Sequence, residues 1–579
     1  MGQFAGLFYA GDAQALRGVC DAPCHVMGRH ALCARSVASD GGAMALVVGR
    51  LRNAAALRDD VRPLGEKYTA SDSALLLGAY RLWGEECAER LEGEALLIVI
   101  DQDAERLLLS SDRMGAAGAL FYAPVRGGVA FAGHPEPLLS VPGVSRRVAR
   151  EGLRMIFGLG PARAPGLTPF RDVFQLPPGT MLIADRRGHS TRRWFRLEAR
   201  AHEDDGGKTI DTVRGLLEQA VDDAAACQPA SMLSGGLDSS VLTALLVRRG
   251  GAVRSFSVDY ENNADYFQGG RYQPEQDAPY VESAVRALHC RHTRVVLSVD
   301  ALCGALDEAV LARGFPGMAD IDSSLLLFSR AIAQHEKYAL SGECSDEVFG
   351  GYPWFSRDEL IFSDGFPWSG SLALRESVLR EDVRDELRLA AYVDGVYREA
   401  LARQSVLPGE DARSARLRLI QGLCFEFFMS NLQERAACMG AAGGLSVLTP
   451  YCDDRLVQYV YNVPWAMKRM MGVEKGLLRA AMRDLLPEEL LMRRKSPYPK
   501  TYHPAYAQAI KRRMAAMLED SSAPILALID RRTLSGLIRS ELSPAETPWF
   551  GQLMAGPQML AYLLQINFWM KRYAVEIST

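Results

Sequence analysis

The stretch Leu233-Ser-Gly-Gly-Leu-Asp-Ser-Ser240 combines two adjacent glycines with three serines and an aspartate. The mostly apolar residues 230–233 lead into it and predict a buried strand, and residues 241–246 follow with the apolar spacing of a helix. A glycine turn between a strand and a helix leaves backbone N–H groups pointing at one place, where the helix dipole favours negative charge. The stretch therefore predicts a phosphate site, and Asp238 could hold a divalent cation beside it.

The same stretch lacks the Gly-Lys-Ser/Thr sequence with which a Walker loop grips a γ-phosphate. It resembles the PP-loop of the AMP-forming ATP pyrophosphatases, which holds the pyrophosphate half of ATP. The alternative is an ordinary serine-rich turn between a strand and a helix. The nucleotide-binding candidates within it are Leu233, Ser234, Gly235, Gly236, Asp238, Ser239 and Ser240.

A second polar stretch, residues 340–352, reads Leu-Ser-Gly-Glu-Cys-Ser-Asp-Glu-Val-Phe-Gly-Gly-Tyr and follows a short predicted strand. It places Glu343, Asp346 and Glu347 beside glycines. Carboxylates next to a phosphate-binding turn are costly unless a cation shares the site, so the two stretches together imply Mg²⁺. Taken alone, the second stretch could equally be an acidic loop with glycine turns.

The first part of the chain is predicted to be rich in strands. Short apolar runs at 43–49, 95–101 and 106–110 are separated by turn or charged segments, and residues 73–83 have helical spacing. A charged, glycine-containing segment, residues 200–208, is interpreted as a linker to the next domain.

Beyond this linker, strand and helix patterns alternate. A strand at 253–259, a helix at 277–288 and a strand at 293–298 follow the phosphate turn, as in a parallel, doubly wound sheet. From about residue 381 helical patterns dominate, for example at 387–400 and 414–432.

Length and composition indicate a soluble globular protein of two to four domains, with 579 residues of which 48% are hydrophobic and 23% charged. The formal net charge of −4 argues against nucleic-acid binding. No apolar run is long enough to predict a membrane span and no export signal is recognised, so we expect a cytoplasmic protein. The 11 cysteines lack metal-ligand spacing and are expected to be small buried thiols.

With both polar stretches present, the sequence resembles the asparagine synthetase B superfamily over nearly its whole length. Three more segments carry the resemblance: residues 321–330, Glu474-Lys-Gly-Leu-Leu-Arg479 and Arg493-Arg-Lys-Ser-Pro-Tyr-Pro-Lys500. It implies an α/β and α+β two-domain chain. Residues 1–200 would form an Ntn-hydrolase-like αββα domain, and residues 209–579 a PP-loop ATP pyrophosphatase domain with a parallel sheet and helices. In this family the second domain converts a carboxylate to an acyl-adenylate, which a nitrogen nucleophile attacks.

The resemblance also implies ATP and Mg²⁺ as cofactors and assigns residues to them. Asp238 and Asp346 would bind Mg²⁺, while the PP-loop serines and Gly236 would hold pyrophosphate. The strand carrying Ser257 and Val258 would contact adenine through its backbone, and Gly342 is a further nucleotide-binding candidate.

Five residues are the catalytic candidates. By the resemblance, Glu343 would orient or deprotonate the attacking amine, which suits a carboxylate within hydrogen-bond reach. Lys475 would lie on the phosphates, and Lys495 would stabilise the oxyanion and the departing AMP, where negative charge develops. Tyr352 and Glu347 are candidates for a pair that deprotonates the amine.

The first domain departs from the family in two places. The glutaminase of this family needs a cysteine as its mature first residue, and this chain opens Met1-Gly2. The family's Asn-Gly-Glu segment, which grips glutamine, aligns with Val48-Gly49-Arg50, although Asp72 is kept. We therefore expect a catalytically dead glutaminase domain and a nitrogen source other than glutamine.

A third departure concerns the acceptor. Ser446 and Leu448 occupy places where asparagine synthetases are expected to carry Glu-x-Arg, so aspartate is not the expected substrate. Family branches without the cysteine take the amine from the substrate itself: β-lactam synthetases close a β-amino acid, and lasso-peptide cyclases join a peptide N-terminus to an acidic side chain.

We favour intramolecular amide formation on a small amino acid, in β-lactam-synthetase-like antibiotic biosynthesis. Three alternatives stay open: macrolactam formation on a precursor peptide, amide synthesis from ammonia or another amine, and a nucleotide-binding pseudo-enzyme subunit. Some β-lactam synthetases have tyrosine where this chain has Glu343, and the residue 343–347 loop lies nearer the asparagine-forming branch. The expected partner is an amino-acid-like molecule or a precursor peptide, with no nucleic acid or membrane, and a homodimer is left open.

Overall fold

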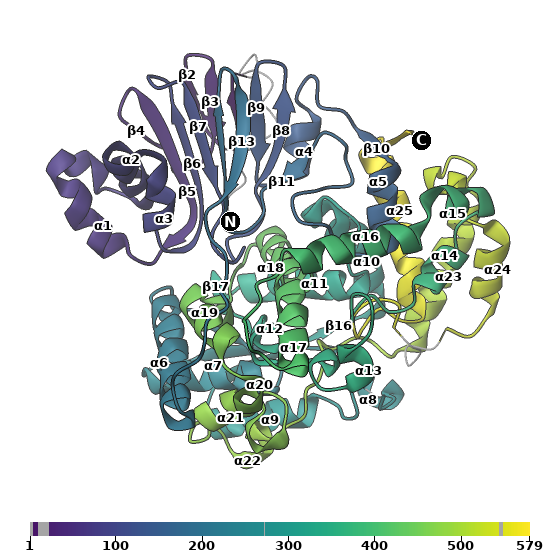
Figure 1. Ribbon diagram of the computed structural model, residues 1–579. Coiled ribbons are helices and arrows are strands. Elements are labelled where there is room, and N and C mark those ends of the chain that lie inside the picture. The colour runs from purple at the N-terminus through teal and green to yellow at the C-terminus, as the bar shows by residue number, and fades with distance from the viewer. Residues whose placement is uncertain (1–3, 10–21, 271, 543–547, 579) are drawn as a thin grey trace. The chain divides into compact units, whose positions relative to one another are not determined.

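The structure, a computed structural model, describes residues 4–9, 22–270, 272–542 and 548–578 (Figure 1). It divides into two compact units: residues 1–152, 163–196 and 573–579 form one, and residues 153–162 and 197–572 form the other. The expected domains, 1–200 and 209–579, differ from this division in two segments. Strand β19 (Glu576–Ser578) returns to pair in parallel with β10 (Arg147–Ala149) of the first unit. Residues 153–162 belong to the second unit, where Tyr562 donates a hydrogen bond to the Ile156 carbonyl at 2.9 Å.

The first unit is built on two six-stranded sheets whose pairings are antiparallel. One has the order β11 (Phe174–Gln175), β8 (Phe121–Val125), β9 (Gly128–Ala132), β1 (Ala5–Phe8), β3 (His30–Cys33), β2 (Cys24–Met27). The other has the order β13 (Gly188–Arg193), β12 (Thr180–Asp185), β7 (Arg106–Ser110), β6 (Gly93–Asp101), β5 (Ala43–Leu51), β4 (Ala38–Ser39). The three strands expected from the sequence are β5, β6 and β7.

The two sheets face each other across an apolar core. Leu32 and Phe131 from one sheet pack in the same cluster as Leu46 and Ile98 from the other, because alternate residues of each strand point to this side. On the opposite face of β5 and β6, helices α1 (Ala54–Val61), α2 (Asp72–Trp83) and α3 (Cys87–Arg90) bury a second cluster. This confirms the layered architecture expected for the first domain.

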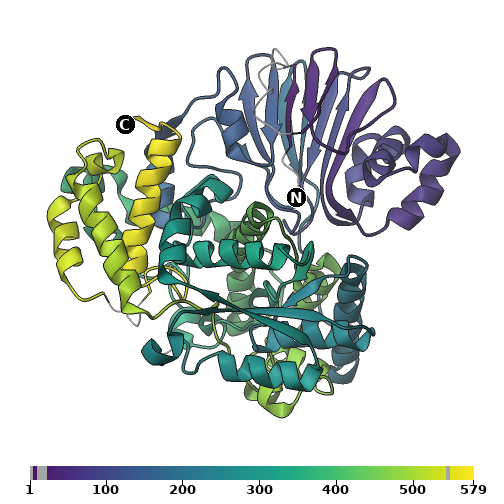
Figure 2. The same cartoon turned by 180° about the vertical axis from the view of Figure 1, so that it is seen from behind.

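The second unit contains a five-stranded parallel sheet with helices on both faces (Figure 2). Its order is β16 (Arg291–Leu297), β15 (Arg254–Tyr260), β14 (Ala230–Met232), β17 (Tyr338–Leu340), β18 (Ser446–Leu448), and every pairing is parallel. The chain therefore winds outward from β14 to one edge and then from β17 to the other. The crevice between β14 and β17 is the switch point at which such sheets bind ligands.

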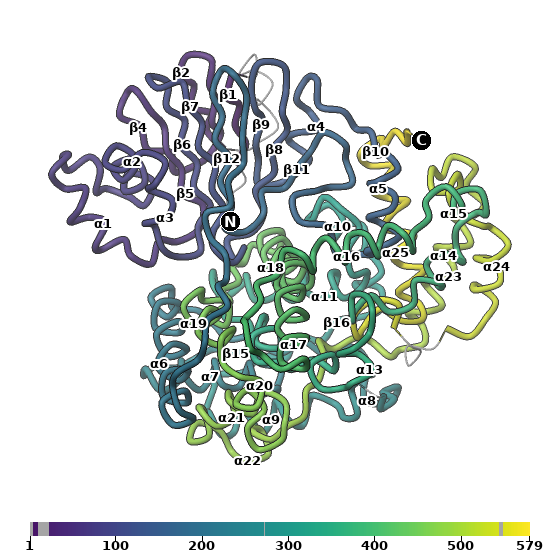
Figure 3. Tube along the Cα trace, in the orientation of Figure 1, coloured from purple at the N-terminus to yellow at the C-terminus, as the bar shows by residue number. Residues whose placement is uncertain are grey.

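Two helices on one face of this sheet fix its core. Phe328 on α11 (Asp320–Ala333) and Ala436 on α18 (Ser430–Gly443) pack with Phe256 and Ala339 of the strands. Helix α10 (Val299–Arg313) lies beside α11 and α18, as the trace shows (Figure 3). Helix α7 (Leu237–Arg248) follows β14, and α9 (Ala278–Leu288) corresponds to the helix expected at 277–288.

Three expected boundaries need correction. Helix α6 (Gly206–Ala225) starts within the expected linker, because the Asp205 side chain caps it by accepting from the Lys208 N–H at 2.8 Å. The helix expected at 387–400 is α16 (Leu389–Ala402). It begins two residues later than expected, because Arg388, with a left-handed φ of +45°, separates it from α15 (Glu381–Leu387). The helix expected at 414–432 is α17 (Ala412–Leu423), a π-helical segment at Cys424–Met429, and the start of α18.

No helix within the described ranges combines the length and the apolar character needed to cross a membrane. The ten cysteines that the structure describes all have free thiols, whereas Cys20 lies outside the described residues.

The turn after β14 depends on glycine at one position. Gly235 has a φ of +69°, and a Cβ there would lie 2.5 Å from the Val281 nitrogen and 2.6 Å from the Tyr280 carbonyl carbon. Gly236 has an extended φ of −73°, and the nearest atom to its Cβ would be the Ser234 Oγ at 3.3 Å. Only Gly235 is therefore required by the backbone itself.

We expect Gly235→Ala to lower the free energy of unfolding by more than about 1 kcal/mol, since it adds both left-handed strain and a backbone clash. Gly236→Ala, one residue away, is the matched control and should change it by less than about 0.5 kcal/mol. Thermal unfolding without nucleotide measures both variants. Equal losses in the two variants would contradict the assignment of strain to Gly235.

Candidate active site

The two polar stretches lie side by side because β14 and β17 are adjacent parallel strands. One pocket, of about 200 Å³, is lined by both. From the sequence-predicted residues it brings together Leu233, Ser234, Gly236, Asp238, Ser239, Ser257, Val258, Gly342, Glu343, Asp346, Glu347, Tyr352, Lys475 and Lys495. Gly235 and Ser240 belong to the same turn and helix but are not among the residues that line the pocket.

The serines of the glycine turn are tied to one another. The Ser234 N–H donates to the Ser239 Oγ at 3.1 Å, and the two hydroxyls lie 3.0 Å apart. The Gly236 N–H lies 3.4 Å from the Ser234 Oγ. Ser240, at the start of α7, is buried, and its hydroxyl has no hydrogen-bond partner among the described residues. These short polar groups therefore surround the N-terminus of α7 with donors suited to phosphate oxygens.

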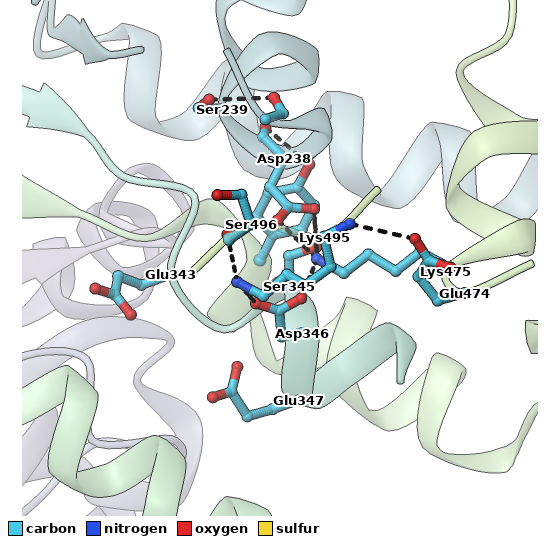
Figure 4. Close-up of polar contacts among 12 residues, drawn as sticks. Asp238, Ser239, Glu343, Ser345, Asp346, Glu347, Glu474, Lys475, Lys495 and Ser496 are labelled. Atoms are coloured by element: carbon cyan, nitrogen blue, oxygen red, sulfur yellow. Dashed lines mark hydrogen bonds and ion pairs between the residues drawn. The ribbon is translucent and has the colours of Figure 1, made fainter. Parts of the chain in front are cut away.

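A buried lysine joins the two stretches (Figure 4). The Lys475 ammonium lies 2.7 and 2.6 Å from the two carboxylate oxygens of Asp238, and 2.5 Å from the Asp346 Oδ1. Ser345 adds a hydrogen bond from its hydroxyl to the Asp238 Oδ1 at 2.7 Å. Lys475 itself adopts a left-handed φ of +55° immediately before α21 (Gly476–Ala481), a strained conformation for a non-glycine residue.

Lys495 approaches Asp346 from the other side. Its ammonium lies 2.8 Å from the Asp346 Oδ2 and donates to the Ser496 carbonyl at 2.9 Å, while Glu474 accepts from its backbone N–H at 3.3 Å (Figure 4). Burial raises the pKa of Asp346, but the ammonium groups of Lys475 and Lys495 outweigh it and hold that pKa below its usual value. Asp346 is therefore a carboxylate at neutral pH.

Glu343 lies near these charges but pairs elsewhere. Its carboxylate accepts from the Arg435 guanidinium at 3.2 Å, and Arg435 also donates to Asp322 at 3.0 Å. Burial raises the pKa of Glu343, opposed in part by Arg435 and Lys495. Arg435, on α18, and Asp322, on α11, were not predicted as site residues. Asp322 lies in the segment 321–330 that carries the family resemblance, but no sequence pattern pairs it with Arg435.

Glu347 and Tyr352 form a buried pair. The Tyr352 hydroxyl donates to the Glu347 carboxylate at 2.8 Å. Burial first, and then the like charges of Asp346 and Glu343, raise the pKa of Glu347 to about 8. The Lys495 ammonium lies 5.7 Å from the centre of the Tyr352 ring. The pair suggested by the sequence is therefore formed, with a carboxyl group whose pKa suits proton transfer near neutral pH.

The other end of the pocket is bounded by β15 and by the segment before Lys495. Ser257 and Val258 line it from the strand. Arg493 donates to the Ser234 carbonyl at 3.1 Å, forms an ion pair with Asp277, and lies 4.1 Å from the centre of the Tyr280 ring. The motif around Arg493 thus anchors the glycine turn, a structural role that its charge alone did not reveal.

The site fits Mg²⁺ bound together with phosphate. Mg²⁺ is usually held by one or two carboxylates and substrate phosphates, and Asp238 and Asp346 supply two carboxylates. Within the described ranges no cluster of three or more His, Cys, Asp or Glu side chains could hold an ion by itself. At Gly351 a Cβ would lie 2.0 Å from the Asp346 Oδ1 and 2.3 Å from the Lys475 Cε, so only glycine lets both side chains pack against the backbone here.

Two expectations concern residues that do not line the pocket. Ser446 and Leu448 are not among the residues that line the pocket, and their effect on the acceptor stays a prediction. They lie on β18, where the Leu448 carbonyl accepts from the Ser341 N–H at 2.9 Å. In the first unit, Asp72 accepts from the Leu51 N–H at 3.4 Å, next to Arg50 on β5. Gly2 lies outside the described residues, so the loss of glutaminase activity stays a prediction.

Lys475→Met should lower the free energy of unfolding by about 3 kcal/mol, because it leaves buried carboxylates without a partner. Because Asp238 is one of those carboxylates, the loss should shrink in the background of Asp238→Asn. Urea unfolding of the two single variants and the double variant gives the coupling. Lys208→Met, at an exposed lysine, is the control, and a loss independent of Asp238 would contradict this account.

Lys500 gives a pH-dependent prediction. Burial lowers its pKa to about 8, against a smaller opposing effect of Asp320. Its stabilising contribution is therefore present above its unfolded pKa of about 10.4 and is lost as the pH falls towards 8. Relative to Lys500→Met, the wild type should gain about 2 kcal/mol between pH 8 and pH 10. Urea unfolding across this range tests it, with Lys208→Met as control; a constant difference would refute the shift.

Comparisons with known proteins cover both units. Residues 212–571 match the asparagine synthase family model, and residues 30–195 match the glutamine amidotransferase domain model. The chain is 38% identical to the glutamine-hydrolysing asparagine synthetase 3 of Bacillus subtilis over 541 residues, covering 92% of this chain and 87% of that protein. It is 22% identical to asparagine synthetase 1 of the same organism, covering 78% and 74%, and 24% identical to the amidase chyE of Penicillium rubens, covering 80% and 78%. Together with the parallel sheet and the paired polar stretches, these matches show that the chain belongs to the asparagine synthetase family of ATP-dependent, amide-forming ligases.

Proposed function

We propose that this ligase adenylates the carboxylate of an amino-acid-like substrate, releases pyrophosphate, and joins the activated acyl group to an amine of the same substrate with release of AMP. The observation that carries the proposal is the arrangement in one pocket of a doubly lysine-paired carboxylate, Asp346, and a protonatable pair, Glu347 and Tyr352. Asp346 would help to bind Mg²⁺ and phosphate, and the Glu347–Tyr352 pair would take a proton from the attacking amine.

The adenylation half depends on charge placement. Asp238 and Asp346 would hold Mg²⁺, which supplies charge neutralisation on the phosphates as the bond between the α- and β-phosphates breaks. The turn at Ser234–Ser239 presents hydroxyl and N–H donors to the departing pyrophosphate. Lys475 lies between the two carboxylates and can donate to a phosphate oxygen once a cation takes its place there.

The amide-forming half depends on moving a proton. An amine enters such a pocket as an ammonium ion, and it attacks only after losing a proton. The ionised form of the Glu347 carboxyl group, which predominates only above a pH of about 8, accepts that proton, and the Tyr352 hydroxyl donates to its oxygen at 2.8 Å. Lys495, between this pair and Asp346, offsets the negative charge that develops on the acyl oxygen and on departing AMP.

A second candidate is glutamine-dependent amide formation. It is favoured by the 38% identity to the Bacillus subtilis enzyme, whose name describes glutamine hydrolysis. Against it we set the Arg50 side chain in the segment aligned with Asn-Gly-Glu, since a guanidinium there repels the ammonium group of glutamine. The two candidates differ only in the source of nitrogen.

The decisive assay offers MgATP with candidate amino acids, with and without glutamine, and identifies the nucleotide product. We expect AMP and pyrophosphate in equal amounts, no dependence on glutamine and no glutamate. Formation of ADP and phosphate would refute adenylation, whereas glutamate formed in step with amide would establish the second candidate.

Variants separate the two halves of the reaction. Asp346→Asn should abolish pyrophosphate release, because it removes a phosphate-site carboxylate. Lys495→Met should lower amide formation about 10²–10³-fold, as the loss of one charge-stabilising donor does, while adenylate still forms. The matched controls are Asp382→Asn and Lys208→Met, both at exposed positions. Normal turnover by Asp346→Asn would remove that carboxylate from the site.

A further inference from the structure

The pocket continues beyond Lys495 into an apolar, largely aromatic wall. The Tyr352 ring stacks on Trp354 with centroids 4.3 Å apart and meets Phe428 edge-on at 5.3 Å. Leu432 and Leu553 line the same pocket. Phe428 reaches this position from the π-helical segment Cys424–Met429, a distortion of helices that is frequent at functional sites. The residues are buried, so the wall has a defined shape.

The segment that carries Leu553 is held rigidly against the rest of the unit. The Trp549 N–H donates to the Met554 carbonyl at 2.8 Å, and the Gly551 N–H donates to the Trp368 carbonyl at 2.8 Å. The Lys500 ammonium donates to the Leu553 carbonyl at 3.3 Å. Since Lys500 ends the motif that contains Lys495, the wall and the catalytic lysine belong to one connected framework.

Charge at this end of the pocket is unfavourable to a second carboxylate. The cation beside Glu343 is Arg435, which is buried and already pairs with Asp322 and Glu343. The other cationic side chains lining the pocket lie at residues 475–479 and 493–495, the segments that contact the glycine turn and Asp346. A free carboxylate placed against Phe428 and Leu553 would lose its hydration, and neither apolar side chain offers it a hydrogen-bond donor.

We propose that the acid activated here has an aromatic or bulky aliphatic body and no second carboxylate, and that Leu553 is a specificity-determining residue for it. This proposal rests on the proposed function for its chemistry, but the shape and charge of the wall can be tested by binding alone. The proposal excludes aspartate as the preferred acid, because Arg435 is already paired with Asp322 and Glu343 and because the wall is apolar.

The binding experiment uses two non-reactive acyl-adenylate mimics, phenylalanyl- and aspartyl-sulfamoyl adenosine, titrated by calorimetry into the full chain with Mg²⁺. We expect the phenylalanyl compound to bind at least about 10-fold more tightly, the discrimination that an apolar pocket provides. Leu553→Ala should weaken the phenylalanyl compound about 10-fold and leave AMP binding within about twofold. Val406→Ala makes the same kind of truncation at a side chain that is 71% exposed and should change neither.

The outcomes separate the two proposals. Tighter binding of the aspartyl compound, or an equal loss for both compounds and AMP in Leu553→Ala, overturns the specificity proposal. A gain-of-function variant adds a test that misfolding cannot mimic: Leu553→Arg should shift the preference towards the aspartyl compound by supplying the missing cation. If the phenylalanyl compound is preferred but no acid yields pyrophosphate from ATP, the proposed function fails while the assignment of the wall stands.

Discussion

The ion pairs of Lys475 with Asp238 and Asp346 are the interaction on which the site depends. Two carboxylates on adjacent strand-to-helix turns would repel each other in a buried pocket. One ammonium group between them removes that repulsion and joins segments that lie more than a hundred residues apart in sequence. In this position Lys475 has a left-handed backbone conformation, which is unfavourable for a non-glycine residue, and the surrounding contacts hold it there. The two carboxylates are therefore held side by side, as the binding of a metal–phosphate complex would require.

The sheet topology explains why these groups meet. Because the strand order reverses between β14 and β17, the turns that follow these two strands open onto the same crevice, and neither is covered by a crossover helix. Close packing of the turns then demands small residues: at Gly342 a Cβ would lie 3.1 Å from the Asp238 Cβ. Lys475 and Lys495 come from the later, helical part of the chain, and both converge on Asp346.

The sequence was sufficient for those parts of the molecule that local patterns encode. The glycine turn, the acidic loop and the alternating strands and helices were all recognisable because backbone geometry and apolar spacing specify them. The ends of helices were less predictable. The Asp205 cap moved the start of α6 into the supposed linker, and the left-handed Arg388 delayed the start of α16 by two residues. The pairing of Arg435 with Asp322 was missed, since the two residues lie 113 positions apart in sequence and only folding brings their helices together.

The residues that select a substrate belong to this last class. Family motifs report the chemistry that members share, which here is the handling of phosphate by Asp238, Asp346 and two lysines. Selectivity comes from side chains such as Phe428 and Leu553, whose apolar character is unremarkable in sequence and acquires meaning only when folding brings them beside Lys495. Ser446 and Leu448 lie on β18, which pairs with β17 and does not itself line the pocket. A change of substrate in this fold therefore requires no change in the motifs, only a different wall facing the same pair of lysines.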